Sequence, residues 1–115
     1  MRMVLLFVAL FTTDYSHARA ELRGNAKSII ITPPLEWKYS LGGYGARMSK
    51  PAEGIHDDIM AKALVLTDDT KKFVVVTMDM LGFPPNLKLM IVENLDGSGW
   101  NMENILLLPS HSHTS

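Results

Sequence analysis

The sequence predicts an α/β fold, a mixed β-sheet with one helix packed on one of its faces. Four short segments are rich in β-branched and apolar residues and are typical of strands. A stretch with helical periodicity lies between the last two of them, and a strand, a helix and a strand in sequence form a crossover between parallel neighbours. A short polar turn joins the two middle segments and predicts an antiparallel hairpin.

The first three strands are predicted from apolar runs and the residues that end them. Residues 28–32 (SIIIT) form the first, which Pro33 and Pro34 terminate, and the polar residues 21–27 before it are expected to be frayed. Residues 59–67 and 73–78 form the hairpin, and the second of these is expected to be the more buried. Residues 35–50 contain several glycines and no clear period, which indicates an ordered loop.

The helix is predicted to lie between Pro84–Pro85, which suit a first turn, and Gly97, which suits a stop. An apolar face is formed at helical spacing by Leu87, Met90, Ile91 and Leu95. The last strand covers residues 105–108 and is apolar throughout, so a central position in the sheet is expected for it.

The first twenty residues have the three parts of a secretory signal peptide. Arg2 gives a basic start, residues 3–11 are apolar, and Ala18-Arg19-Ala20 is a small-x-small ending. The apolar run is too short for an ordinary transmembrane helix. We therefore expect cleavage after Ala20 and a secreted or periplasmic product, residues 21–115, with a buried N-terminal helix and an uncleaved anchor as the alternatives.

Charge and composition exclude several kinds of partner and site. The formal charge is −1, and residues 1–20 contain two arginines and one aspartate, so residues 21–115 carry −2. This small charge predicts neither a nucleic-acid partner nor strong attraction to anionic membranes. There is no cysteine, so an exported domain has no disulfide, and a metal site must use nitrogen and oxygen ligands.

Two histidines, His111 and His113, follow the last predicted strand. In an extended segment residues i and i+2 point the same way, so both rings are expected to project from the end of that strand. Both could then bind one Zn²⁺ at about 2.0–2.1 Å, or one could bind the metal while the other orients a substrate oxygen. The alternative is a pair of solvated histidines near an irregular chain end.

Three enzyme classes carry His-x-His after an apolar strand. The metallo-β-lactamase pattern continues His-x-His-x-Asp-His, but Ser115 stands where that pattern has Asp. Barrel-type amidohydrolases place the motif after their first strand, whereas three predicted strands and a helix come first here. The third class depends on a wider match, whose landmarks are ITPP (31–34), GYG (43–45), GIHD (54–57), AKALVL (61–66), VVVTMDM (74–80) and NILLLPSHSHTS (104–115).

In order and spacing these landmarks resemble the N-terminal catalytic domain of the neutral/alkaline, non-lysosomal ceramidase family, over roughly residues 28–115. The resemblance implies a zinc-dependent hydrolase that cleaves the amide bond of ceramide into a sphingoid base and a fatty acid. The family motif Thr-His-Thr-His-Ser is matched here by residues 110–114 with exchanged hydroxyl residues. By resemblance, His111 is a zinc ligand, and His113 lies beside the metal and assists the oxyanion or the leaving group.

The family's other ligands, a His, a Glu and a Tyr, lie downstream in longer chains. We therefore expect this sequence to be the N-terminal portion of a larger layered catalytic domain, which alone binds zinc weakly and lacks activity. The implied partner is a ceramide-like lipid, with peripheral contact to membrane lipid. An exported amidase or esterase for another substrate and a non-catalytic binding domain remain as alternatives.

Two further residues are predicted to lie near the site. Asp79 follows the strand of residues 73–78 and could accept a hydrogen bond from a ligating histidine, although a plain strand-end aspartate is an equal alternative. His56 lies in a loop that leads into a strand and could contact substrate or support the metal ligands. Its alternative is a loop histidine that bonds local backbone groups.

Overall fold

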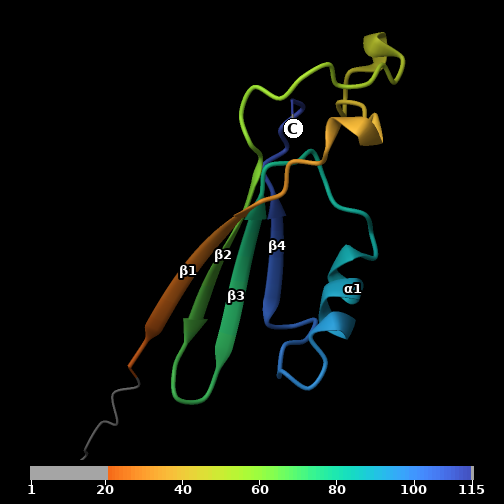
Figure 1. Cartoon of the computed structure of the whole chain (residues 1–115). Helices are drawn as coiled ribbons and strands as arrows, with labels where there is room; N and C mark the ends of the chain where they lie inside the picture. The colour runs from red at the N-terminus through yellow and green to blue at the C-terminus, as the bar shows by residue number, and fades with distance from the viewer. Residues whose placement is uncertain (1–20, 115) are drawn as a thin grey trace, which may run out of the picture.

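The computed structural model describes residues 21–114 and contains one four-stranded sheet in the order β1-β2-β3-β4 (Figure 1). The strands are β1 (Arg23–Ile30), β2 (Met60–Thr67), β3 (Lys72–Met78) and β4 (Ile105–Pro109). The first two pairings are antiparallel, and β3 pairs with β4 in parallel. The predicted α/β fold with a mixed sheet is confirmed, whereas the predicted signal peptide, residues 1–20, lies outside the described residues.

The β2–β3 hairpin is formed as predicted and is closed by Asp68. Its carboxylate accepts hydrogen bonds from the backbone N–H groups of Thr70 and Lys71, each 2.7 Å away, and from the Thr70 hydroxyl at 2.9 Å. These donors favour the ionised form and hold the pKa of Asp68 below its ordinary value. The turn thereby sets the register in which Thr67 faces Lys72.

The crossover helix α1 (Leu87–Asn94) connects β3 to β4 and lies beside β4 (Figure 1). Its existence is confirmed, but the predicted apolar face is wrong in two of its four positions. Leu87 and Ile91 are half-buried, whereas Met90 is 49% and Leu95 38% exposed. Apolar residues occur on more than one side of this short helix, so their spacing alone does not select the side that faces the sheet.

The most buried side chains lie on one face of the sheet, where its parallel pair meets. Val74 and Ile105 are paired across β3 and β4, and only 8% and 2% of their surfaces are exposed. Residues opposite each other in neighbouring strands share a face, so both belong to the same side. The other face includes Leu64 and Leu106, which are 43% and 41% exposed. The core of the described residues is therefore small and one-sided.

Two sequence predictions about the strands are corrected. Residues 23–27 are not frayed but belong to β1, where Arg23 pairs with Thr67. Every side chain of β1 is exposed, so backbone pairing with β2, rather than burial, holds this strand. The apolar strand β4 was expected to be central, yet within the described residues it is the last strand in the sheet order.

The long connection between β1 and β2 is ordered, as predicted. It contains two short 3₁₀ helices, η1 (Leu35–Trp37) and η2 (Gly45–Arg47), and a bridge between Ser40 and Pro51. The Ala52 N–H donates to the Tyr39 carbonyl at 2.9 Å and extends this bridge. In the part of the chain that the structure describes, no helix has the length and apolarity needed to cross a membrane.

Replacing Asp68 by Ala is expected to lower the thermal unfolding midpoint at pH 7, because three hydrogen bonds of the turn are lost. Since the folded pKa lies below the ordinary value of 3.8, the carboxylate stabilises the fold above that pH and less as the pH falls further. Melting curves of both proteins between pH 7 and pH 2 should therefore converge at acid pH. Asp69→Ala, which removes only an exposed ion pair with Arg23, is the control. A constant difference down to pH 2 would contradict the assignment.

Candidate functional site

Three segments meet at the sheet edge where β3 and β4 end. Because these strands are parallel, the residues that follow them emerge side by side. The Ser110 N–H donates to the Met78 carbonyl at 2.9 Å, and the His111 N–H donates to the Met80 carbonyl at 3.0 Å. The loop around Tyr44 approaches the same edge, because the Tyr44 ring lies against the ring of His113. This junction contains both predicted site histidines.

His111 does not continue the strand, which corrects the sequence prediction of an extended His-x-His pair. β4 ends at Pro109, and the backbone of His111 has φ +60°, in the left-handed region. A non-glycine residue in this region costs on the order of 1–2 kcal/mol unless local contacts compensate it. The Nδ1–H of His111 donates to the Leu81 carbonyl at 3.0 Å, so the ring is held by the segment that follows β3.

His113 is half-buried and is held by the loop between β1 and β2. Its Nδ1–H donates to the Gly42 carbonyl at 3.1 Å. The Tyr44 ring lies edge-on to it, with 5.8 Å between ring centroids and 78° between planes. The rings of His111 and His113 are also edge-on, with centroids 5.2 Å apart. The two predicted imidazoles therefore come together, although not through extended geometry.

The hydrogen-bond partners determine the tautomer of both rings. A carbonyl oxygen can only accept, so Nδ1 must carry the hydrogen in His111 and in His113. In the neutral ring this leaves Nε2 with the lone pair. An imidazole with Nδ1–H on a backbone carbonyl and a free Nε2 has the form needed for a metal ligand or a proton acceptor.

The donor set therefore fits part of a zinc site but does not complete one. Neutral imidazole nitrogen is a common zinc ligand, and a tetrahedral site takes four ligands. Within residues 21–114, no cluster of three or more histidine, aspartate or glutamate side chains could enclose an ion. Further ligands would have to come from outside the described residues.

Two glycines allow the loop to approach other segments, Gly43 the ring of His113 and Gly42 the side chain of Leu81, and sequence reasoning had assigned these contacts to neither. Gly43 has φ +78°, and a Cβ atom added there would lie 1.9 Å from Nδ1 of His113. A Cβ on Gly42 would lie 2.7 Å from a methyl group of Leu81. At Gly43 a side chain would be strained and would also overlap the His113 ring, whereas at Gly42 it would require the Leu81 side chain to shift. The signal in the sequence was the Gly-Gly pair beside Tyr44, but its partners are distant in the chain.

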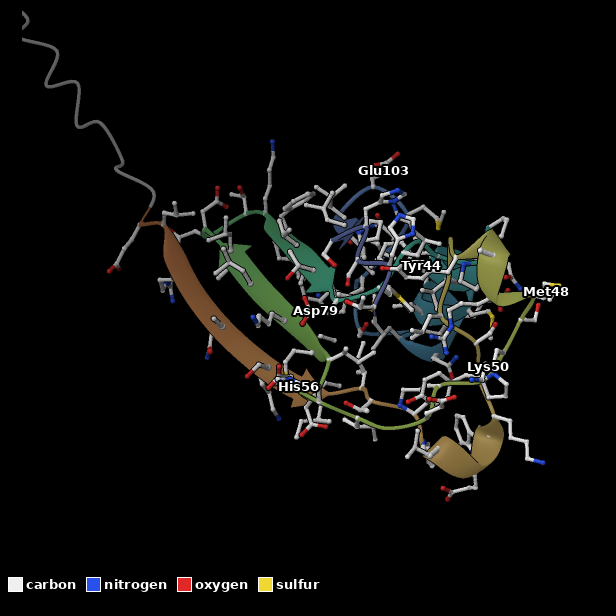
Figure 2. The ribbon with its side chains drawn as sticks, turned by 90° about the horizontal axis from the view of Figure 1, so that it is seen from above. Tyr44, Met48, Lys50, His56, Asp79 and Glu103 are labelled. Carbon is white, nitrogen blue, oxygen red and sulfur yellow. The ribbon has the colours of Figure 1, made fainter. Side chains whose placement is uncertain are left out.

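The side chains of Asp79 and His56 form their hydrogen bonds with groups other than the paired rings. The Asp79 carboxylate accepts the Met60 N–H at 3.0 Å, and so in the described structure it supports the start of β2 rather than a histidine. The exposed His56 donates from Nδ1 to the Asp57 carboxylate at 2.6 Å. Figure 2 shows both labelled side chains separated from Tyr44. Their roles near a metal or substrate remain predictions.

The fold is similar to part of a solved structure, neutral ceramidase from Pseudomonas aeruginosa. The TM-score is 0.71 at 22% sequence identity, and the match covers 83% of this chain. It covers 16% of the ceramidase chain, so the present chain spans a small part of that enzyme's length. No family model and no curated protein sequence matches the chain. At this level of identity the similarity establishes a shared fold.

Gly43→Ala is expected to displace the His113 ring and break its bond to the Gly42 carbonyl, because the added methyl group would overlap Nδ1. Nitrogen-15 NMR of the imidazole should then show that His113 has lost its single tautomer. The ring of His56, which is bonded to Asp57 further along the same connection, should keep its spectrum.

Two glycine variants separate this effect from backbone strain. Gly45→Ala lies in the same connection with no atom near the added Cβ, and Gly97→Ala introduces a similar strain at φ +73° in open space. Both should leave the His113 spectrum unchanged. If Gly43→Ala also left it unchanged, or if Gly97→Ala altered it equally, the proposed contact would be wrong.

Proposed function

We propose that this chain contributes to a zinc-dependent hydrolase that cleaves the amide bond of a ceramide-like lipid. The observation that carries the proposal is the pair of edge-on imidazoles whose Nδ1–H groups are bound to the Leu81 and Gly42 carbonyls. The fold shared with a neutral ceramidase supports the choice of reaction, and the landmarks of the sequence support the choice of substrate.

His111 is assigned as the zinc ligand. Its Nδ1–H is fixed by a carbonyl from the segment after β3, which leaves Nε2 for the metal. The remaining ligands are assigned to residues outside the described part of the chain, because a complete set is absent within residues 21–114. When bound, zinc supplies Lewis acidity toward the substrate carbonyl and lowers the pKa of water.

His113 is assigned to proton transfer. Amide hydrolysis adds a hydroxyl group to the carbonyl carbon, breaks the carbon–nitrogen bond and adds a proton to the departing nitrogen. The free Nε2 of His113 can take a proton from the attacking water and then give it to the amine. The Gly42 carbonyl keeps Nδ1–H in place throughout, and it also stabilises the charged ring that forms between the two transfers.

The first test uses the full-length, zinc-loaded protein that carries this chain. His111→Ala should lose zinc and activity, because a ligand is removed. His113→Ala should keep most of its zinc and lose about 10²–10⁴-fold in rate, the usual contribution of general acid–base catalysis. Metal content is measured by elemental analysis, and turnover with a fluorescent ceramide.

A fluorescent ester and a short N-acyl amide, assayed in parallel, distinguish ceramide from the alternative substrates of an exported amidase or esterase. His56→Ala is the matched histidine control and should keep its zinc, because its ring bonds Asp57 in another loop. Full zinc content and full activity in both His111→Ala and His113→Ala would contradict the proposal and favour a non-catalytic binding domain.

The proposal includes export directed by residues 1–20, whose basic start, apolar run and Ala-Arg-Ala ending have the pattern of a signal peptide. The N-terminal residue of the mature protein, determined by sequencing after expression in its own host, should be Glu21. Ala20→Arg, which replaces the small residue immediately before the cleaved bond, should leave uncleaved precursor. A mature protein that still begins at Met1 would contradict export by this segment.

A further inference from the structure

A cavity of about 290 Å³ is lined by Thr114, the residue that follows His113, and has no role in the scheme above. Two parts of the chain form its walls, namely the connection between β1 and β2, from Thr32 to Ile59, and Thr114 near the other end of the chain. Pro33, Leu41 and Ile55 provide apolar surface, while His56 and Asp57 provide polar groups. A mixed lining of this kind is typical of sites for small organic groups.

The walls of the cavity are held together by hydrogen bonds within the protein. The Thr32 hydroxyl accepts the Ile59 N–H at 2.9 Å and donates to the Asp58 carboxylate at 2.8 Å. The Ile31 N–H donates to the Ile59 carbonyl at 2.9 Å, and the Ala52 N–H donates to the Tyr39 carbonyl at the same distance. These bonds join the two ends of the long connection to each other and hold its middle together, so the cavity is formed before any ligand binds.

The cavity is connected to His113 by a hydrogen bond whose two partners, His113 and Gly42, are each followed or preceded by a residue of the cavity wall. Leu41 lines the cavity and precedes Gly42, whose carbonyl accepts from His113. Thr114 lines it and follows His113. The two residues joined by the 3.1 Å bond between His113 Nδ1 and the Gly42 carbonyl are therefore each one residue away in sequence from a residue that lines the cavity. His111 is instead bound to Leu81, which does not line the cavity.

The charge of the lining distinguishes between the two products of amide hydrolysis. Near neutral pH an alkyl amine is cationic and a carboxylic acid is anionic. The lining includes the Asp57 carboxylate and contains no lysine or arginine. Because the Asp57 side chain is 86% exposed, solvent screens its charge, and the preference for a cation is of a few-fold size.

From this position and charge we infer that the cavity binds the amine portion of the substrate, the part that leaves as a hydroxyl-bearing ammonium ion. The inference rests on the proposed function, in which His113 gives a proton to the departing nitrogen. In this assignment, the substituents of a nitrogen beside His113 extend past Thr114 toward the cavity, and the exposed side chains of Asp57 and His56 at its rim contact their hydroxyl and ammonium groups. The volume holds roughly ten water-sized groups, enough for a polar head but too small for a long chain.

The test uses two small probes on the full-length, zinc-loaded protein: 2-amino-1,3-propanediol for the amine side and hexanoate for the acyl side. Binding is followed by the NMR shifts of the Ile55 and Thr114 backbone amides, and by competition with a fluorescent amide substrate. The amine should shift both amides and inhibit competitively, whereas hexanoate should leave both shifts unchanged. The titration is repeated without zinc, because an amine nitrogen can also bind the metal directly.

Asp57→Asn removes the charge but keeps an acceptor for His56, and it should raise the inhibition constant of the amine about 2–5-fold, the size expected for an exposed ion pair. The inhibition constant of hexanoate should stay the same. Asp69→Asn is the matched control, because Asp69 is an exposed carboxylate at the other end of β2, paired with Arg23. It should change neither constant.

The possible outcomes distinguish a failure of the amine-pocket inference from a failure of the proposed function. Shifts caused by hexanoate rather than by the amine would overturn the inference. So would amide hydrolysis without amine-induced shifts, which would leave the proposed function in place. Amine-induced shifts in a zinc-loaded protein that hydrolyses no amide would overturn the proposed function, and with it the assignment of the bound amine as a product.

Discussion

The parallel pairing of β3 with β4 is the constraint on which the site depends. It places Val74 opposite Ile105 in the small core, and it makes both strands end at the same sheet edge. The segment after β3 then provides carbonyl groups at the position where the histidines leave β4. Without the crossover through α1, the His111 ring would have no partner at Leu81, because 30 residues of sequence separate the two. The strand order, rather than closeness in sequence, thus brings His111 to its carbonyl partner at this edge.

The two histidines are held by similar bonds from different parts of the fold. A carbonyl after β3 holds His111, and a carbonyl in the long β1–β2 connection holds His113, 71 residues away in sequence. Both bonds select the tautomer with a free Nε2. Since each anchor belongs to a different segment, the relative position of the rings depends on the packing of the whole sheet edge. The glycines of the connection make the second anchor sterically feasible.

The sheet edge that carries His111 and His113 differs in its chemical groups from the cavity lined by Thr114. The edge provides nitrogen lone pairs, while the cavity combines apolar walls with one carboxylate and one imidazole. The proposed reaction assigns proton transfer to His113, and the proposed amine pocket begins at its neighbour Thr114, so the two proposals require one substrate to extend across both parts of the site.

The sequence by itself determined the α/β class, three of the strands, the hairpin at Asp68 and the association of His111 with His113, because these depend on local periodicity and on short turns. It missed residues 23–27 of β1, whose exposed side chains carry no burial pattern, and the side of α1 that faces the sheet. Only the tertiary structure decided the left-handed turn at His111 and the carbonyl partners of both rings. These depend on contacts between segments far apart in the chain, where no local pattern records the partner.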